Sequence, residues 1–121
     1  GTGLAPLKTM IEYLLTVLKV KQNIVLYIGF TNYEDVFMKD YFNLLSKKFS
    51  NFRSEIVVCN KCSDWKGSVG FITAPLKKDF PDASKCSAYM CGNNLMIRDA
   101  TKILLDNGCS AERIYFEKYE A

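Results

Sequence analysis

The regular alternation of short apolar runs with helix-spaced apolar stripes is what most constrains the fold of this chain. The runs are uninterrupted, which is typical of strands buried on both faces of a parallel sheet. The stripes between them repeat at the spacing of amphipathic helices. Strands that alternate with helices imply right-handed crossovers and a parallel sheet covered on both faces, a three-layer Rossmann-like α/β fold. The predicted strands are residues 24–28, 56–59, 88–91 and 114–116.

Capping residues and glycines set the predicted helix ends. Residues 60–70 are polar and rich in turn formers, so they are predicted as a loop. The first predicted helix covers residues 7–18, and the second is a stripe from Tyr33 to Leu45 that follows a capping box of Thr31 and Glu34. Thr73 is predicted to cap a short third helix. The fourth is capped by Asn93 or Asn94 and ends at Gly108.

Composition excludes several classes of function. The 121 residues fit one small domain, and the net charge of +3 is spread along the chain, so nucleic-acid binding is not expected. The chain has no histidine, which removes Ser-His and Cys-His nucleophilic machinery and histidine-ligated metals. No apolar stretch is long enough for a membrane span. Chemistry must therefore come from a cofactor or a partner.

The five cysteines indicate reduced thiols and not a disulfide framework, because their number is odd and they are scattered. Together with the lack of a signal pattern, this favours the cytoplasm. Cys59 and Cys62 form a Cys-x-x-Cys spacing, but no second pair exists to complete a zinc site. The spacing is interpreted as accidental, and no metal is expected.

Glycine or polar residues follow the strand ends, where parallel sheets bind ligands. The chain opens "GTGLAP", which is typical of a turn into a helix N-terminus that accepts a phosphate. Three more turns are expected at the same edge, at residues 29–31, 59–61 and 91–93. Four such turns favour a nucleotide site over an ordinary loop.

Five motifs, in order, carry a resemblance to a known family. They are "GTGLAP", "YIGF", "WKGSVG", "YMCGNNLMIRDA" and "IYFEKYEA", and they cover almost the whole chain. Together they resemble the pyridine-nucleotide-binding half of the ferredoxin-NADP reductase family. The branch is similar to the NADH-using reductase components that feed oxygenases and other electron-transfer partners.

The resemblance implies that this chain is the C-terminal part of a larger flavoenzyme. The family motif has one more glycine before Gly1, so the central first strand of the sheet and the FAD-binding domain are expected upstream. The whole enzyme would pass a hydride from NAD(P)H to FAD and then single electrons to an iron–sulfur or haem acceptor. The chain alone would bind nucleotide weakly and catalyse nothing.

The resemblance also assigns site residues. Cys91 and Gly92 would flank the nicotinamide, and Cys91 would position the ring so that the cofactors carry out the hydride transfer. The other expected cofactor contacts are Gly1, Thr2, Gly3, Leu4 and Pro6 in the first turn, Gly29, Phe30 and Thr31 in the second, Cys59, Asn60 and Lys61 at the adenosine ribose, Asn93 and Met96 behind the nicotinamide, and Tyr119 over the flavin.

Two departures from the family pattern qualify these assignments. Asn93 stands where the family commonly has proline, and Asn60 with Lys61 replaces the Ser-Arg of NADP-specific members, which favours NADH. Two alternatives stay open. One is a non-enzymatic nucleotide- or partner-binding doubly wound module, and the other is an electron-transfer subunit of a larger complex.

Overall fold

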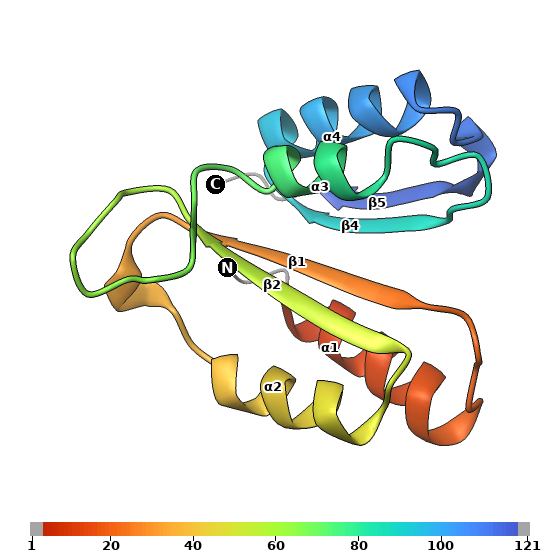
Figure 1. Cartoon of the computed structure of the whole chain (residues 1–121). Helices are drawn as coiled ribbons and strands as arrows, with labels where there is room; N and C mark the ends of the chain where they lie inside the picture. The colour runs from red at the N-terminus through yellow and green to blue at the C-terminus, as the bar shows by residue number, and fades with distance from the viewer. Residues whose placement is uncertain (1–3, 119–121) are drawn as a thin grey trace. The chain divides into compact units, whose positions relative to one another are not determined.

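A computed structural model describes residues 4–118 of the chain, which has the α/β class predicted from the sequence, with strands that pair in parallel (Figure 1). The described residues divide into two compact units, one made of residues 9–72 and the other of residues 4–8 and 73–118. The described strands form a three-stranded sheet in the first unit and a two-stranded sheet in the second.

The first unit is built on the parallel order β1-β2-β3. Strand β1 pairs with β2 over its full length, from Ile24 opposite Phe52 to Phe30 opposite Val58. Because the two strands end in register, the turns that follow them lie at the same edge. The strands are β1 (Ile24–Phe30), β2 (Phe52–Val58) and β3 (Ser68–Val69).

Helix α2 covers part of this sheet through aromatic packing. Phe42 of α2 is completely buried, and its ring centre lies 6.3 Å from that of Phe52. Helix α1 continues into a five-residue π-helix, η1, and the Tyr41 hydroxyl of α2 donates a hydrogen bond to the Glu12 carboxylate at the end of α1. The helices are α1 (Leu4–Glu12), η1 (Tyr13–Val17), η2 (Tyr33–Asp35) and α2 (Lys39–Lys48).

The second unit pairs β4 with β5 in parallel and packs α4 against both strands. Asn93 caps α4, because its side-chain oxygen accepts a hydrogen bond of 2.9 Å from the backbone N–H of Met96. Gly108, with φ of 98°, ends the helix as predicted. The elements are α3 (Thr73–Asp79), β4 (Ala88–Gly92), α4 (Asn94–Asp106), η3 (Ala111–Arg113) and β5 (Ile114–Lys118).

The predicted second helix is wrong in its first half. Thr31 and Glu34 form no capping box, and the chain makes only the short 3₁₀ turn η2 before it extends again. Phe37 lies in this extended part with its ring edge-on to Phe30, at 5.7 Å between ring centres. Helix α2 begins only after Met38, which has φ of 64°. The aromatic contact thus overrides the helical spacing of the stripe.

The strand ends also differ from the prediction. Strand β1 runs through Gly29 to Phe30, and β2 starts at Phe52 and not at residue 56. The first half of β2 was not predicted because its polar residues interrupt the apolar run. Strand β3 lies inside the predicted loop, and two residues are too few for a pattern.

The helices of this fold are short. Within residues 4–118, no helix combines the length and the hydropathy that a membrane span requires.

Candidate functional site

Backbone hydrogen bonds join the turns that follow β1 and β2. The N–H of Cys59 donates to the carbonyl oxygen of Phe30 at 2.8 Å, and the N–H of Asn60 donates to the carbonyl oxygen of Thr31 at 2.9 Å. The side-chain amide of Asn60 donates to Asn32 Oδ1 at 2.7 Å. The structure therefore brings together two of the predicted turns in the first unit, and it fixes the side chain of Asn60.

An exposed aromatic residue extends this edge of the sheet. The N–H of Gly70 bonds to the carbonyl oxygen of Val58 at 2.9 Å, and Phe71 follows with 70% of its surface exposed. Sequence reasoning missed Phe71. An aromatic side chain directly after a turn glycine, beyond the polar loop, was the available signal.

Gly29 is close-packed within the same edge. A Cβ built at Gly29 would lie 3.2 Å from a side-chain methyl carbon of Ile72, so a larger residue would press on the segment that leads away from β3. Its backbone is exposed, which fits the predicted approach of a ligand. Lys61, beyond Asn60, is also exposed and gives this edge a positive charge.

In the second unit, Cys91 and Gly92 end β4 and Asn93 caps α4. The Met96 side chain folds back over Gly92, and a Cβ at Gly92 would lie 2.3 Å from Met96 Cε. The predicted residues of this turn are therefore in contact, with Met96 against the glycine backbone. The Cys91 side chain is half-buried.

The remaining predicted residues divide into two groups. Gly1, Thr2, Gly3 and Tyr119 lie outside the residues that the structure describes. Leu4 is only 5% exposed, so its side chain is part of the core, and Pro6 is exposed in the first turn of α1. The phosphate turn at residues 1–3 therefore stays a prediction from the sequence.

The acidic and cysteine side chains are the residues of this chain that could hold a metal ion. Across residues 4–118, none of them are grouped as a metal site requires. Cys86 and Cys109 are neighbours, since the thiol of Cys109 donates to the carbonyl oxygen of Cys86 at 3.4 Å. Burial, then the neighbouring Cys109 and Asp82, raise the pKa of the Cys86 thiol, so this thiol is less readily ionised.

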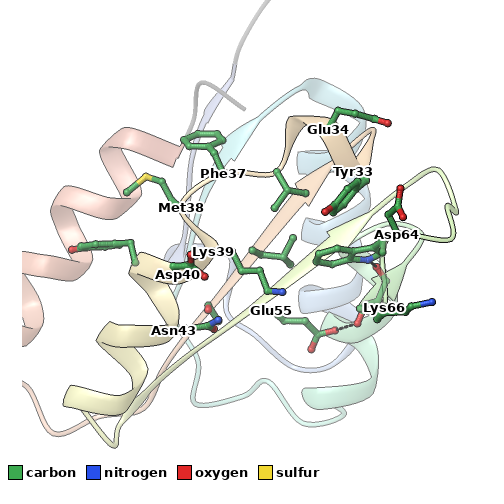
Figure 2. Close-up of a pocket in the computed structure, with 17 residues that line it drawn as sticks. Tyr33, Glu34, Phe37, Met38, Lys39, Asp40, Asn43, Glu55, Asp64 and Lys66 are labelled. Atoms are coloured by element: carbon green, nitrogen blue, oxygen red, sulfur yellow. Dashed lines mark hydrogen bonds between the residues drawn. The ribbon is translucent and has the colours of Figure 1, made fainter.

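A groove of about 910 Å³ lies in the first unit, and none of the predicted site residues line it (Figure 2). Trp65 forms one wall, is 9% exposed, and donates its indole N–H to the Ser68 carbonyl oxygen at 2.8 Å. The Tyr33 ring lies 6.1 Å from that of Trp65, and the Lys39 ammonium lies 5.4 Å from the Trp65 ring centre. The groove is thus a mixed aromatic and charged surface.

Comparison with known proteins adds to this geometry. The sequence model of the family described as "Oxidoreductase NAD-binding domain" matches residues 1–102. One component of the Na(+)-translocating NADH-quinone reductase of Pseudoalteromonas atlantica is 29% identical over 98% of this chain and 31% of its own length. The CDP-6-deoxy-L-threo-D-glycero-4-hexulose-3-dehydrase reductase of Yersinia pestis is 29% identical over 98% of this chain and 36% of its own length.

Among solved structures, the cytochrome P450 reductase GcoB of Amycolatopsis superposes with a TM-score of 0.86. It is 26% identical, and the match covers 98% of this chain and 35% of the reductase. The chain therefore spans about a third of the length of each of these relatives.

Proposed function

The chain belongs to the oxidoreductase NAD-binding domain family, and from this we propose that it binds a reduced pyridine nucleotide and presents it to a flavin held by another domain. The observation that carries the proposal is the joined edge at Phe30, Thr31, Cys59 and Asn60. It lies at the carboxyl ends of parallel strands, where nucleotides bind in folds of this class.

At this edge, Asn60 and Lys61 take the adenosine ribose. The bond to Asn32 orients the Asn60 amide, which leaves its oxygen to accept a hydrogen bond from a ribose hydroxyl. Phe71 offers an exposed ring on which adenine can stack. Asn60 and Lys61, in place of the serine and arginine pair of NADP-specific members, support NADH over NADPH.

In the second unit, Cys91 and Gly92 take the nicotinamide. The glycine lets the ring approach the backbone, and Met96 supports the glycine from behind. The half-buried thiol of Cys91 fixes the orientation of the ring. The bound nucleotide supplies the hydride, and no proton transfer is assigned to a residue of this chain.

The whole protein is proposed to be larger than this chain. Residues 1–121 act as its NAD(P)-binding domain, FAD lies on an N-terminal domain, and electrons pass to an iron–sulfur or haem acceptor. This arrangement is supported by two findings: the chain matches only about a third of the length of its relatives, and those relatives are named as reductases. The scattered reduced cysteines support a cytoplasmic location.

Titration of the 121-residue chain with NADH, followed by nucleotide fluorescence, tests the proposal. Weak saturable binding is expected, with NADPH bound less tightly. The same chain should not reduce ferricyanide with NADH when no flavin is added. Absence of saturable binding by folded chain, or flavin-free reduction of ferricyanide, would contradict the proposal.

A further inference from the structure

The outer edge of β2 is the starting point. Strand β3 pairs only with Val57 and Val58, so among the described strands none borders the outer edge of residues 52–56. An open strand edge of this kind is a template for another extended segment. The groove lies along this edge, since Ser54, Glu55 and Ile56 line it.

The cause of the short β3 lies at Gly67. A Cβ there would come within 2.5 Å of the Trp65 ring, so the indole occupies the space beside the glycine. The Trp65 indole bond to Ser68 holds the preceding loop in this folded-back shape. As a result, the chain does not continue β3 alongside Glu55, and the space is left as a groove.

Charge indicates what the groove accepts. Four carboxylates and two ammonium groups line it, a net charge of −2 on a chain of net charge +3. None of the four carboxylates forms an ion pair with another residue in the described range, although Glu55 accepts a hydrogen bond from Ser68 at 2.9 Å. The carboxylates are those of Glu34, Asp40, Glu55 and Asp64, and the ammonium groups those of Lys39 and Lys66.

Both sides of the groove carry carboxylates. Lys39 and Lys66 offset the charges of Asp40 and Asp64, so Glu34 and Glu55 supply the net negative charge. Figure 2 shows Asp40 and Asn43 of α2 on one side and Asp64 and Lys66 on the other, with Glu55 between them. The Lys39 ammonium group lies against the Trp65 ring, so this wall of the groove is compatible with a positive charge. A cationic side chain entering from outside would meet carboxylates on either side.

We propose that this groove binds an extended segment of a partner protein that carries lysine or arginine and adds as a strand to the open edge of β2. Backbone hydrogen bonds to Ser54 and Ile56, which face away from β1 in the parallel ladder, provide the pairing, and the cationic side chains meet the carboxylates. The groove is separate from the predicted nucleotide contacts, none of which line it. Nucleotide binding and segment binding can therefore be measured independently.

Trp65 is the only tryptophan of the chain, so its fluorescence reports on the groove. The chain is titrated with a short peptide of alternating valine and arginine. Two comparison peptides have glutamate in place of arginine or proline in place of valine. The valine and arginine peptide should change Trp65 emission saturably, and each comparison peptide should bind about tenfold more weakly. Equal binding of all three would overturn the proposal.

A double variant tests the charges. Glu34→Gln with Asp64→Asn should weaken binding of the valine and arginine peptide about tenfold. The matched control, Glu112→Gln with Asp99→Asn, removes two exposed carboxylates of the second unit and should leave affinity unchanged. Equal weakening by both pairs would show non-specific attraction and would contradict the proposal, as would complete competition by free arginine.

Hydrogen exchange on the unmodified chain provides a readout that needs no variant. The peptide should slow amide exchange at Ser54 and Ile56, whose N–H groups face away from β1 and gain new backbone hydrogen bonds on strand addition, and it should leave Glu55 unchanged. Unchanged exchange at Ser54 and Ile56 under saturating peptide would contradict strand addition.

Discussion

The side-chain amide of Asn60 donates a 2.7 Å hydrogen bond to Asn32 Oδ1, which joins the turn after β2 to the turn after β1. Each turn is also tied to the other through the backbone, by the bond from Asn60 N–H to the Thr31 carbonyl oxygen. The side chain proposed to bind the ribose is therefore oriented before the nucleotide arrives. Such preorganisation lowers the entropic cost of binding.

Asn32→Ala is expected to weaken NADH binding without unfolding the chain. The variant removes the acceptor for the Asn60 amide, and a hydrogen bond contributes about 0.5–1.5 kcal/mol net. NADH affinity should fall by about threefold to tenfold in a calorimetric titration. Asn23→Ala, at an exposed asparagine before β1, is the matched control. The same loss in both variants would argue against a role for the Asn32 and Asn60 pair.

Phe71→Ala should weaken the binding of nucleotides that carry adenine and leave the binding of other nucleotides unchanged. Stacking of a base on an aromatic side chain is worth about 1–3 kcal/mol. Affinity for ADP-ribose should fall about tenfold or more, with little change for nicotinamide mononucleotide. Because Phe71 is 70% exposed, the melting temperature should barely change. Tyr13→Ala, which removes another exposed aromatic ring, should leave both affinities intact.

Gly92→Ala is expected to displace Met96 more than it destabilises the fold. The added Cβ would meet the flexible end of the Met96 side chain, which can move at a cost of about 1 kcal/mol. Gly92 has no positive φ, so the backbone accepts alanine. Thermal unfolding should show a small loss of stability in Gly92→Ala. Adding Met96→Ala should recover this stability in the double variant, while NADH affinity stays low. Full recovery of affinity in the double variant would contradict contact between the nicotinamide and Gly92.

Tyr41 predicts how stability depends on pH. Burial, then the hydrogen bond to Glu12 and its charge, raise the pKa of Tyr41 to about 12 from its ordinary 10.0. Because the folded-state pKa is the higher one, the contribution of Tyr41 is complete below pH 10 and is lost as the pH rises to about 12.

Tyr41→Phe removes this phenol, so the variant should lose less stability than the unmodified chain over that range. Urea unfolding at several pH values measures the difference. Tyr13→Phe removes a phenol that does not bond to Glu12, and it serves as the control. Identical pH profiles for the two variants would show that the Glu12 bond is not the cause.

Local signals explain which parts of this structure the sequence predicted. Asn93 and Gly108 mark the ends of α4 because caps and stops depend on the backbone nearby. The break between Tyr33 and Lys39 was missed because it depends on the contact between Phe30 and Phe37, which the helical spacing of the stripe does not reveal. Packing between the end of a strand and the segment that follows it leaves no mark in the periodicity.

The same distinction applies to the sites. The pairing of the turns after β1 and β2 followed from the rule that parallel strands end at one edge, and the hydrogen bonds of Cys59 and Asn60 agree with it. The groove beside β2 depends on where Trp65 places its ring against Gly67. The groove therefore depends on the orientation of one side chain, and no sequence pattern predicted the groove.

Binding of NADH at the carboxyl-end turns is the function proposed for this chain. The most direct test is an NMR titration of the isotope-labelled 121-residue chain with NADH. Amide shifts are expected at residues 29–32, 59–61 and 91–96, with the signals of Trp65 and residues 54–56 unchanged. A folded chain that shows no shifts with NADH, or shifts confined to the groove around Trp65, would contradict this function.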